Sequence, residues 1–236
     1  MNRYAKAEHK FFMATAVWYA ITVFWGFAPS FYLAKFNEDY ESLPKSLIIH
    51  GVIFTIWISL YVLQVFLIRS KNFKLHKLLG IFGLVVMIFM VPSGLFPVVY
   101  KVYAGWVPID AAGHNVFRLC AGYLFFTLAF IYRKESFLHK RFILSCMVML
   151  MSAAIFRISF DFGLEASQVF NKGLQVLPAV ALFIFDLIYH RKLVFIDLLS
   201  VLAVFSIFLL ADSFWLSTIG EKTMDALIYL FIKPFV

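Results

Sequence analysis

Long stretches without a charged residue constrain this chain more than any other feature. Three uncharged runs cover residues 11–34, 46–68 and 78–100. A helix needs about 20 mostly apolar residues to cross the hydrocarbon of a bilayer, and each run is long enough. Because the runs lack the alternation of apolar and polar residues that half-buried strands show, they predict helices in lipid.

The composition agrees with this interpretation. Apolar residues make up 63% of the 236 residues and charged residues 14%, whereas soluble domains have roughly 45–50% and about 25%. Too few polar side chains are present to cover a water-soluble globule. We therefore exclude a disordered chain, a fibrous repeat and a nucleic-acid-binding domain. The lipid bilayer is the expected partner, in a bacterial inner membrane or a plasma membrane.

The charged residues mark the ends of the predicted spans. We expect one all-α transmembrane domain over residues 1–236, built as a seven-helix bundle. The tail, 224–235, is too short to cross a bilayer and is predicted to be interfacial or re-entrant. The predicted spans are 11–34, 46–68, 78–100, 112–132, 142–160, 173–190 and 193–216.

Lysines and arginines predict the orientation, because basic loops stay in the cytoplasm. The N-terminus and the loops at 69–77, 133–141 and 191–192 carry 13 of the 21, against six on the other side and two within spans. This distribution places the N-terminus inside and the C-terminus outside. It also accounts for much of the formal net charge of +8, which need not indicate an anionic macromolecule.

Part of the sequence resembles a duplicated hairpin. His50 and His114 are 64 positions apart, as are Arg69 and Arg133, and His76 precedes His139 by 63. Each unit combines an inward-running helix, a basic turn and an outward-running helix that begins His-Lys or close to it. We therefore predict that spans two and three form a parallel repeat with spans four and five.

Several of these residues also resemble a family pattern. His50-Gly51, Trp57, Gln64 and the segment 76–80 (His-Lys-Leu-Leu-Gly) are similar to the HG…W…Q…H(R/K)xLG pattern of an uncharacterised bacterial family of multispan membrane proteins, and later landmarks continue with HKR at 139–141. The resemblance covers about residues 30–192. It implies a multispan fold but no particular activity, and His114 has no counterpart in the pattern.

The outer half of the predicted bundle gathers ionisable residues, which are costly within spans and are therefore candidates for function. Arg118 follows His114 by one helical turn, and Asp161 follows Arg157 by the same spacing. These pairs and His50 predict an outward-opening polar cavity, closed near Pro92–Pro97 and Trp106. The alternative is structural: Asp161 and Asp212 could pair with the two arginines. The predicted ligand-binding residues are His50, His114, Arg118, Arg157 and Asp161.

The inner half gathers a second set. Outward-running helices begin here, and their N-terminal dipoles beside the cations would suit a phosphate or a lipid head group. The alternative is a solvated basic collar that only fixes the topology. This predicted cytoplasmic polar cluster comprises His76, His139, Arg141, Asp186 and His190, with Asp197 at the same depth.

Two hypotheses about function follow. The first is a transporter or ligand-binding module for a small anionic solute held by Arg118 and Arg157. The second is a membrane redox protein that binds haem b or a quinone through paired histidines, with His50 and His114 as outer ligands and His76 and His139 as inner ones. No zinc-protease, serine-hydrolase or P-loop pattern occurs, so the sequence identifies no reaction.

Overall fold

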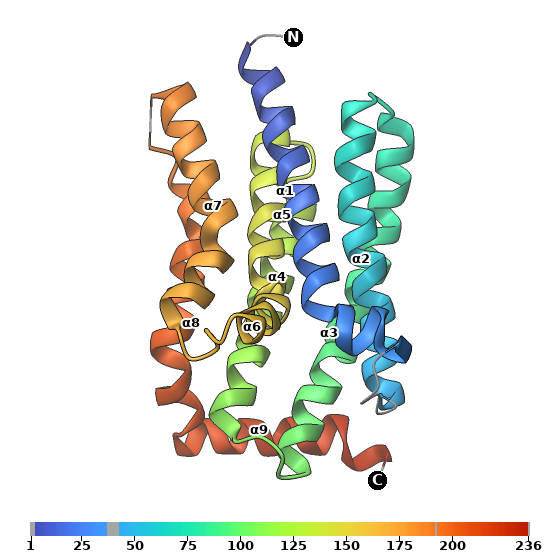
Figure 1. The fold of residues 1–236 in the computed structure, drawn as a ribbon, viewed down its shortest axis with the longest axis vertical. Helices are drawn as coiled ribbons and strands as arrows, with labels where there is room; N and C mark the ends of the chain where they lie inside the picture. Colours follow the sequence, from blue (N-terminus) through green and yellow to red (C-terminus); the bar gives the residue numbers. More distant parts are fainter. Residues whose placement is uncertain (1–2, 37–42, 192, 236) are drawn as a thin grey trace.

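The computed structural model describes residues 3–36, 43–191 and 193–235. Within these ranges it contains helices and loops and no strand (Figure 1). The α-helices are α1 (Arg3–Phe27), α2 (Lys45–Arg69), α3 (Phe73–Tyr103), α4 (Ile109–Ile131), α5 (Ser136–Leu150), α6 (Ser152–Asp161), α7 (Gln168–His190), α8 (Leu199–Trp215) and α9 (Thr218–Phe231). A π-helical turn, Ala28–Tyr32, continues α1, and 3₁₀ turns cover Ala34–Phe36, Phe195–Leu198 and Lys233–Phe235.

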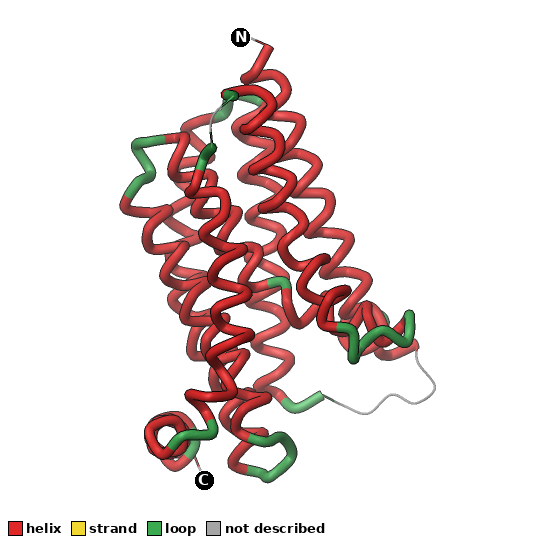
Figure 2. The backbone as a smooth tube through the Cα atoms, turned by 90° about the vertical axis from the view of Figure 1, so that its left-hand side faces the viewer, coloured by secondary structure: helices red, strands yellow, loops and turns green. Residues whose placement is uncertain are grey.

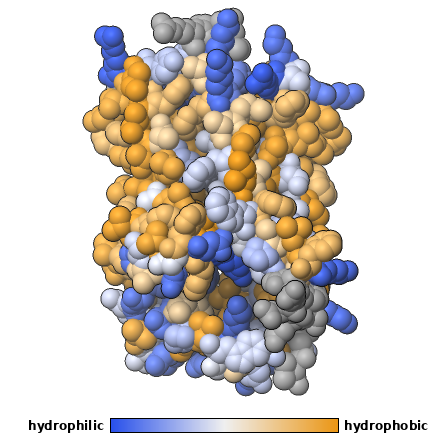
Figure 3. Space-filling model, viewed as in Figure 1, coloured by the Kyte–Doolittle hydropathy of each residue, from blue (hydrophilic) through white to orange (hydrophobic). Residues whose placement is uncertain are grey.

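The long helices stand side by side as a bundle suited to a membrane. In the described ranges, six segments are long and apolar enough to cross a bilayer, and the bent pair α5–α6 makes up to seven. Large apolar side chains face outward around the bundle, and Figure 3 shows hydrophilic side chains mainly at its two ends. The fold is therefore that of an all-helical, multi-pass integral membrane protein.

Helix α3 does not break at its prolines. Pro92 and Pro97 lie inside one continuous helix of 31 residues, so these prolines do not interrupt the third predicted span. Lipid-exposed helices tolerate proline where neighbouring helices and side chains satisfy the backbone groups that it frees. At about 1.5 Å per residue, α3 is about 46 Å long, which exceeds the roughly 30 Å of a hydrocarbon core.

The bend lies instead in the fifth predicted span. Helices α5 and α6 meet at Met151 with an angle of 47° between them. Near this bend α6 approaches α1 closely: a Cβ added at Gly26 would lie 2.4 Å from the Ala154 carbonyl oxygen. A glycine at this position therefore lets the two backbones come together, and the approach fixes where α6 lies.

The two ends of the molecule differ. Figure 1 shows the α6–α7 connection well above the lower end, which α3, α4, α8 and α9 form. Helix α9 lies across that end, and Figure 2 shows it end-on. It packs on the bundle through Gly220 and Met224 and exposes Ile219, Tyr229 and Leu230. The predicted tail segment thus lies along the end of the bundle, and its helix begins at Thr218 rather than at 224.

Two apolar clusters hold the bundle together. The larger one fills the middle around α5, where Cys146, Met147, Val148 and Met149 are fully buried. The smaller cluster lies between α9 and the rest of the bundle. It includes Trp215, which packs onto α4 at Gly113. Between them, the ends of α1 and α6 leave room for a cavity.

Candidate functional site

The cavity has a volume of about 300 Å³ and lies in the half of the molecule away from the N-terminus. Figure 3 shows a recess in the lower half of this face with hydrophilic side chains around it. The cavity walls come from the end of α1, the first turns of α2, the C-terminal half of α3, helix α4 and the α5–α6 bend. The polar side chains that line it are Ser30, Tyr32, His50, Lys101, Asn115, Arg118, Ser152 and Arg157.

The two arginines reach the same cavity from different helices. Arg118 lies on α4, one turn after His114, and Arg157 lies on α6. Among the described residues, the guanidinium of Arg118 donates one long hydrogen bond, of 3.5 Å, to the Asn115 side chain. The guanidinium of Arg157 lies 4.5 Å from the centre of the Phe27 ring. Among the described residues, neither arginine forms an ion pair with a carboxylate.

His50 forms part of the wall between α2 and α3. Its Nδ1 lies 3.3 Å from the Ser93 hydroxyl, and its ring stacks on Phe54. A Cβ added at Gly94 would come within 3.2 Å of the imidazole, so this glycine gives the ring its space. His50 is therefore held in place by neighbours and still faces the cavity.

Two lysines add positive charge at or near the cavity. Lys101 lines the cavity from the last turn of α3. Lys172, at the start of α7, is buried with its ammonium 5.2 Å from the Phe208 ring centre, and it interacts electrostatically with Arg118. From the sequence, both lysines were expected only among the basic residues of the loops opposite the N-terminus. None of the described residues that line the cavity carries a carboxylate.

Two predicted ligand-binding residues do not line the cavity. His114 turns to α8, where its Nε2 lies 2.7 Å from a carboxylate oxygen of Asp212. Asp161 accepts a hydrogen bond of 2.7 Å from the Trp25 indole. Both carboxylates proposed as partners of the arginines thus bind other groups, and the alternative of two closed arginine pairs was wrong for the described residues. Trp106 also lies outside the wall, whereas Pro97 belongs to it.

The opposite end of the bundle contains a second polar cluster, which differs from the predicted anion site. Arg141 is fully buried and contacts two buried carboxylates, Asp186 and Asp197. A solvated collar and a phosphate site both require an accessible guanidinium, so neither interpretation fits Arg141. Glu8 and Tyr4 of α1 also join this cluster. Their contribution was missed because α1 was predicted to begin only at residue 11.

The inner histidines lie near each other at the starts of α3 and α5. The rings of His76 and His139 have their centres 6.4 Å apart and are nearly perpendicular. His139 Nδ1 lies 2.8 Å from the Ala129 carbonyl oxygen, and His76 Nδ1 is buried with no hydrogen-bond partner among the described residues. In the described ranges, no group of three or more metal-binding side chains could hold a metal ion.

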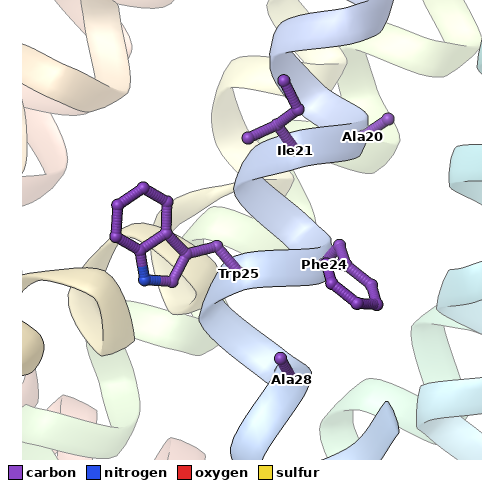
Figure 4. Close-up of a pocket in the computed structure, with 5 residues that line it drawn as sticks. All are labelled: Ala20, Ile21, Phe24, Trp25 and Ala28. Carbon is purple, nitrogen blue, oxygen red and sulfur yellow. The ribbon is translucent and has the colours of Figure 1, made fainter. Parts of the chain in front are cut away.

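A second hollow lies on the outer surface of α1 (Figure 4). Ala20, Ile21, Phe24, Trp25 and Ala28 line it, and Figure 4 shows Phe24 and Trp25 pointing to opposite sides of the helix. Its walls are almost entirely apolar and exposed, as expected for a helix surface that faces acyl chains. It offers no polar group that would orient a solute.

Comparison with known proteins gives no further constraint: no family model, curated protein or solved structure matches the chain. The likeness to an uncharacterised multispan family, noted from the sequence, therefore stays a prediction.

Proposed function

We propose that the protein binds a small anionic solute in the cavity between Arg118 and Arg157, as a transporter or a ligand-binding module. The main observation in support is that two arginines face one cavity and that neither has a carboxylate partner among the described residues. Lys101 and His50 add donors to the same wall. Carboxylate, sulfonate and phosphate groups match the planar donors of guanidinium and bind it through paired, charge-assisted hydrogen bonds.

The free-energy cost of placing these arginines within membrane-spanning helices favours the presence of a bound anion. Insertion of an arginine at the centre of a membrane helix costs about 2.5–3.5 kcal/mol, and an ion pair or water normally offsets part of this cost. Here the carboxylates predicted to do so are bound to His114 and Trp25. An anion in the cavity would neutralise both guanidinium groups at once.

The size and walls of the cavity limit the solute. Ligand cavities usually measure about 300–1,000 Å³, and this one, at about 300 Å³, is at the lower end. Phe27, Phe31, Phe54, Met90 and Leu119 supply apolar wall beside the cations. A small organic anion with an acidic group and an apolar body fits both parts.

The charges of the loops support access from outside the cell. The basic turns at 69–77 and 133–141 lie at the same end of the bundle as the N-terminus, and the cavity lies toward the other end (Figure 1). If basic loops stay in the cytoplasm, seven spans result, with the N-terminus inside and the cavity facing outward. The parallel repeat of α2–α3 with α4–α5 is part of the same proposal.

A screen of small anions against the purified protein tests the proposal. At least one carboxylate, sulfonate or phosphate should raise the temperature of thermal unfolding. Arg118→Gln or Arg157→Gln should each weaken its apparent affinity about 10- to 100-fold, because a hydrogen bond to a charged group contributes about 1.5–3 kcal/mol. Arg133→Gln, an exposed arginine at the other end, is the control and should behave as wild type. If an anion stabilised wild type and a variant that combines Arg118→Gln with Arg157→Gln equally, this result would contradict the proposal.

The redox alternative has one favourable observation, the nearness of His76 and His139. The outer pair fits haem poorly, because Asp212 occupies Nε2 of His114 while His50 lies against Ser93. A haem or quinone site would therefore have to use the inner pair alone. A Soret band that shifts on reduction with dithionite would support haem in the purified protein.

A further inference from the structure

A cluster of charges joins four elements at the N-terminal end of the bundle. Arg141 of α5 is at its centre, with Asp186 of α7 on one side and Asp197 of the Phe195–Leu198 turn on the other. The titratable and charged side chains that meet here are Tyr4 and Glu8 of α1, Lys140 and Arg141 of α5, Asp186 and His190 of α7, and Asp197.

The charges of this cluster do not balance. Glu8 binds Lys140 at the rim, which leaves one guanidinium, Arg141, between two carboxylates. The side chains of Arg141, Asp186 and Asp197 are all completely buried. With neutral His190, the three buried groups would carry one excess negative charge, and an uncompensated buried charge costs several kcal/mol.

We propose that this cluster binds one proton, and that the proton resides on Asp197. Addition of the proton converts the carboxylate to a neutral carboxylic acid and leaves a balanced pair of Arg141 and Asp186. The site is distinct from the anion cavity, which lies toward the other end of the molecule.

The hydrogen bonds indicate which carboxyl group holds the proton. Asp186 accepts a hydrogen bond from Arg141 Nη2, and His190 Nε2 lies 3.7 Å away. The Tyr4 hydroxyl lies 3.3 Å from Asp186 and shares its single proton between Asp186 and Glu8, which is nearer at 2.7 Å. The one cationic group in contact with Asp197 among the described residues is the Nε group of Arg141, 2.9 Å from Oδ1, and the Asp186 carboxylate also lies beside it. Neither oxygen of Asp197 forms a hydrogen bond of good geometry with a described residue. Because hydrogen bonds stabilise the ionised form, Asp186 is the carboxylate and Asp197 the acid.

A proton fits this place better than a metal ion. Ca²⁺, for example, needs six or more oxygen ligands, and no suitable group of three acidic, histidine or cysteine side chains occurs in the described ranges. A proton needs no cavity and only one acceptor oxygen.

The proton site and the anion cavity share one structural element. The bent pair α5–α6 supplies Arg141 to the cluster and Arg157 to the cavity, and Leu150 and Ser152 beside the bend line the cavity wall. If the anion is transported, which rests on the proposed function, the cluster closes the cytoplasmic end and supplies a coupling proton. Opening that end would separate Arg141 from α7 and Asp197.

Infrared spectroscopy and thermal unfolding of the purified full-length protein test the proton site. We expect the carbonyl band of a protonated carboxylic acid at neutral pH, lost in Asp197→Asn and retained in Asp225→Asn, an exposed control on α9. Asp197→Asn should unfold close to the wild-type temperature, because an amide replaces a neutral acid. Asp186→Asn removes the carboxylate that binds Arg141 Nη2 and leaves Asp197 and the more distant Glu8 to balance the guanidinium, so it should unfold at a clearly lower temperature than wild type.

Three outcomes would overturn the inference: no carboxylic acid band in wild type, a band that persists in Asp197→Asn, or destabilisation by Asp197→Asn as severe as by Asp186→Asn. Stabilisation by sodium chloride but not by choline chloride would assign the site to a metal ion instead. These measurements use none of the carboxylates, sulfonates or phosphates of the anion screen, and chloride is common to the two salts compared. Their failure therefore leaves the proposed function standing, and a failed anion screen leaves the proton site standing.

Discussion

At the scale of single residues, the contacts with neighbouring helices decide which side chains line the cavity, and the position along a span does not. Arg118 and His114 lie one turn apart on α4, yet only Arg118 lines the cavity. The side chain of Asp212 is 57% exposed and binds His114 at the molecular surface. Exposed ion pairs of this kind usually contribute about 0–1 kcal/mol, so we assign His114 a minor structural role.

Replacement of His114 tests this assignment. His114→Ala should lower the free energy of unfolding by no more than about 1 kcal/mol and leave anion affinity unchanged. Thermal unfolding with and without the best anion of the screen measures both quantities. A loss of affinity as large as that of Arg118→Gln would return His114 to the binding site.

At the scale of helices, the close approach of α1 and α6 positions one wall of the cavity. Gly26→Ala would place a methyl group against the backbone of Ala154, so the two helices must separate. We expect a loss of about 1–3 kcal/mol of stability, as for other overpacked sites, together with weaker anion binding. Both effects are measured by thermal unfolding with and without the anion.

Gly173→Ala on α7 is the matched control for this substitution. A Cβ there meets nothing within 4 Å, and alanine should stabilise the helix by about 0.5–1 kcal/mol. If Gly26→Ala were as stable as Gly173→Ala, the packing of α6 on α1 described above would be wrong.

The helices were largely predictable from the sequence, whereas their bends and side-chain partners were not. Runs without charge mark helices because lipid leaves the backbone no other partner. The bend at Met151 involves neither proline nor glycine at the joint, whereas Pro92 and Pro97 lie inside the continuous helix α3. Of the predicted ligand-binding residues, His50, Arg118 and Arg157 line the cavity. His114 and Asp161 do not, because their contacts depend on how α4 and α6 are rotated relative to their neighbours. The spacing of residues along one helix does not determine that rotation.

At the scale of the whole molecule, the two ends carry different kinds of charge. The N-terminal end buries Arg141 between acidic groups, and the other half directs into a cavity two arginines that have no carboxylate partner among the described residues. A closed end and an open end are what a transporter needs when it faces outward. In the proposed function, the open end is a positively charged site that a solute reaches from outside the cell.

The most direct test is the labelling of a cysteine in the cavity wall of intact cells. Ala153 lines the cavity and is exposed, and both arginines stay in place in an Ala153→Cys variant. Because Cys120 is exposed and Cys146 buried, the background needs only Cys120→Ser. Impermeant thiol reagents that differ only in the sign of their charge are compared. We predict that the anionic reagent reacts faster than the cationic one without permeabilisation, and that Arg118→Gln with Arg157→Gln removes this preference. Labelling only after permeabilisation, or faster labelling by the cationic reagent, would contradict an outward-facing anion site.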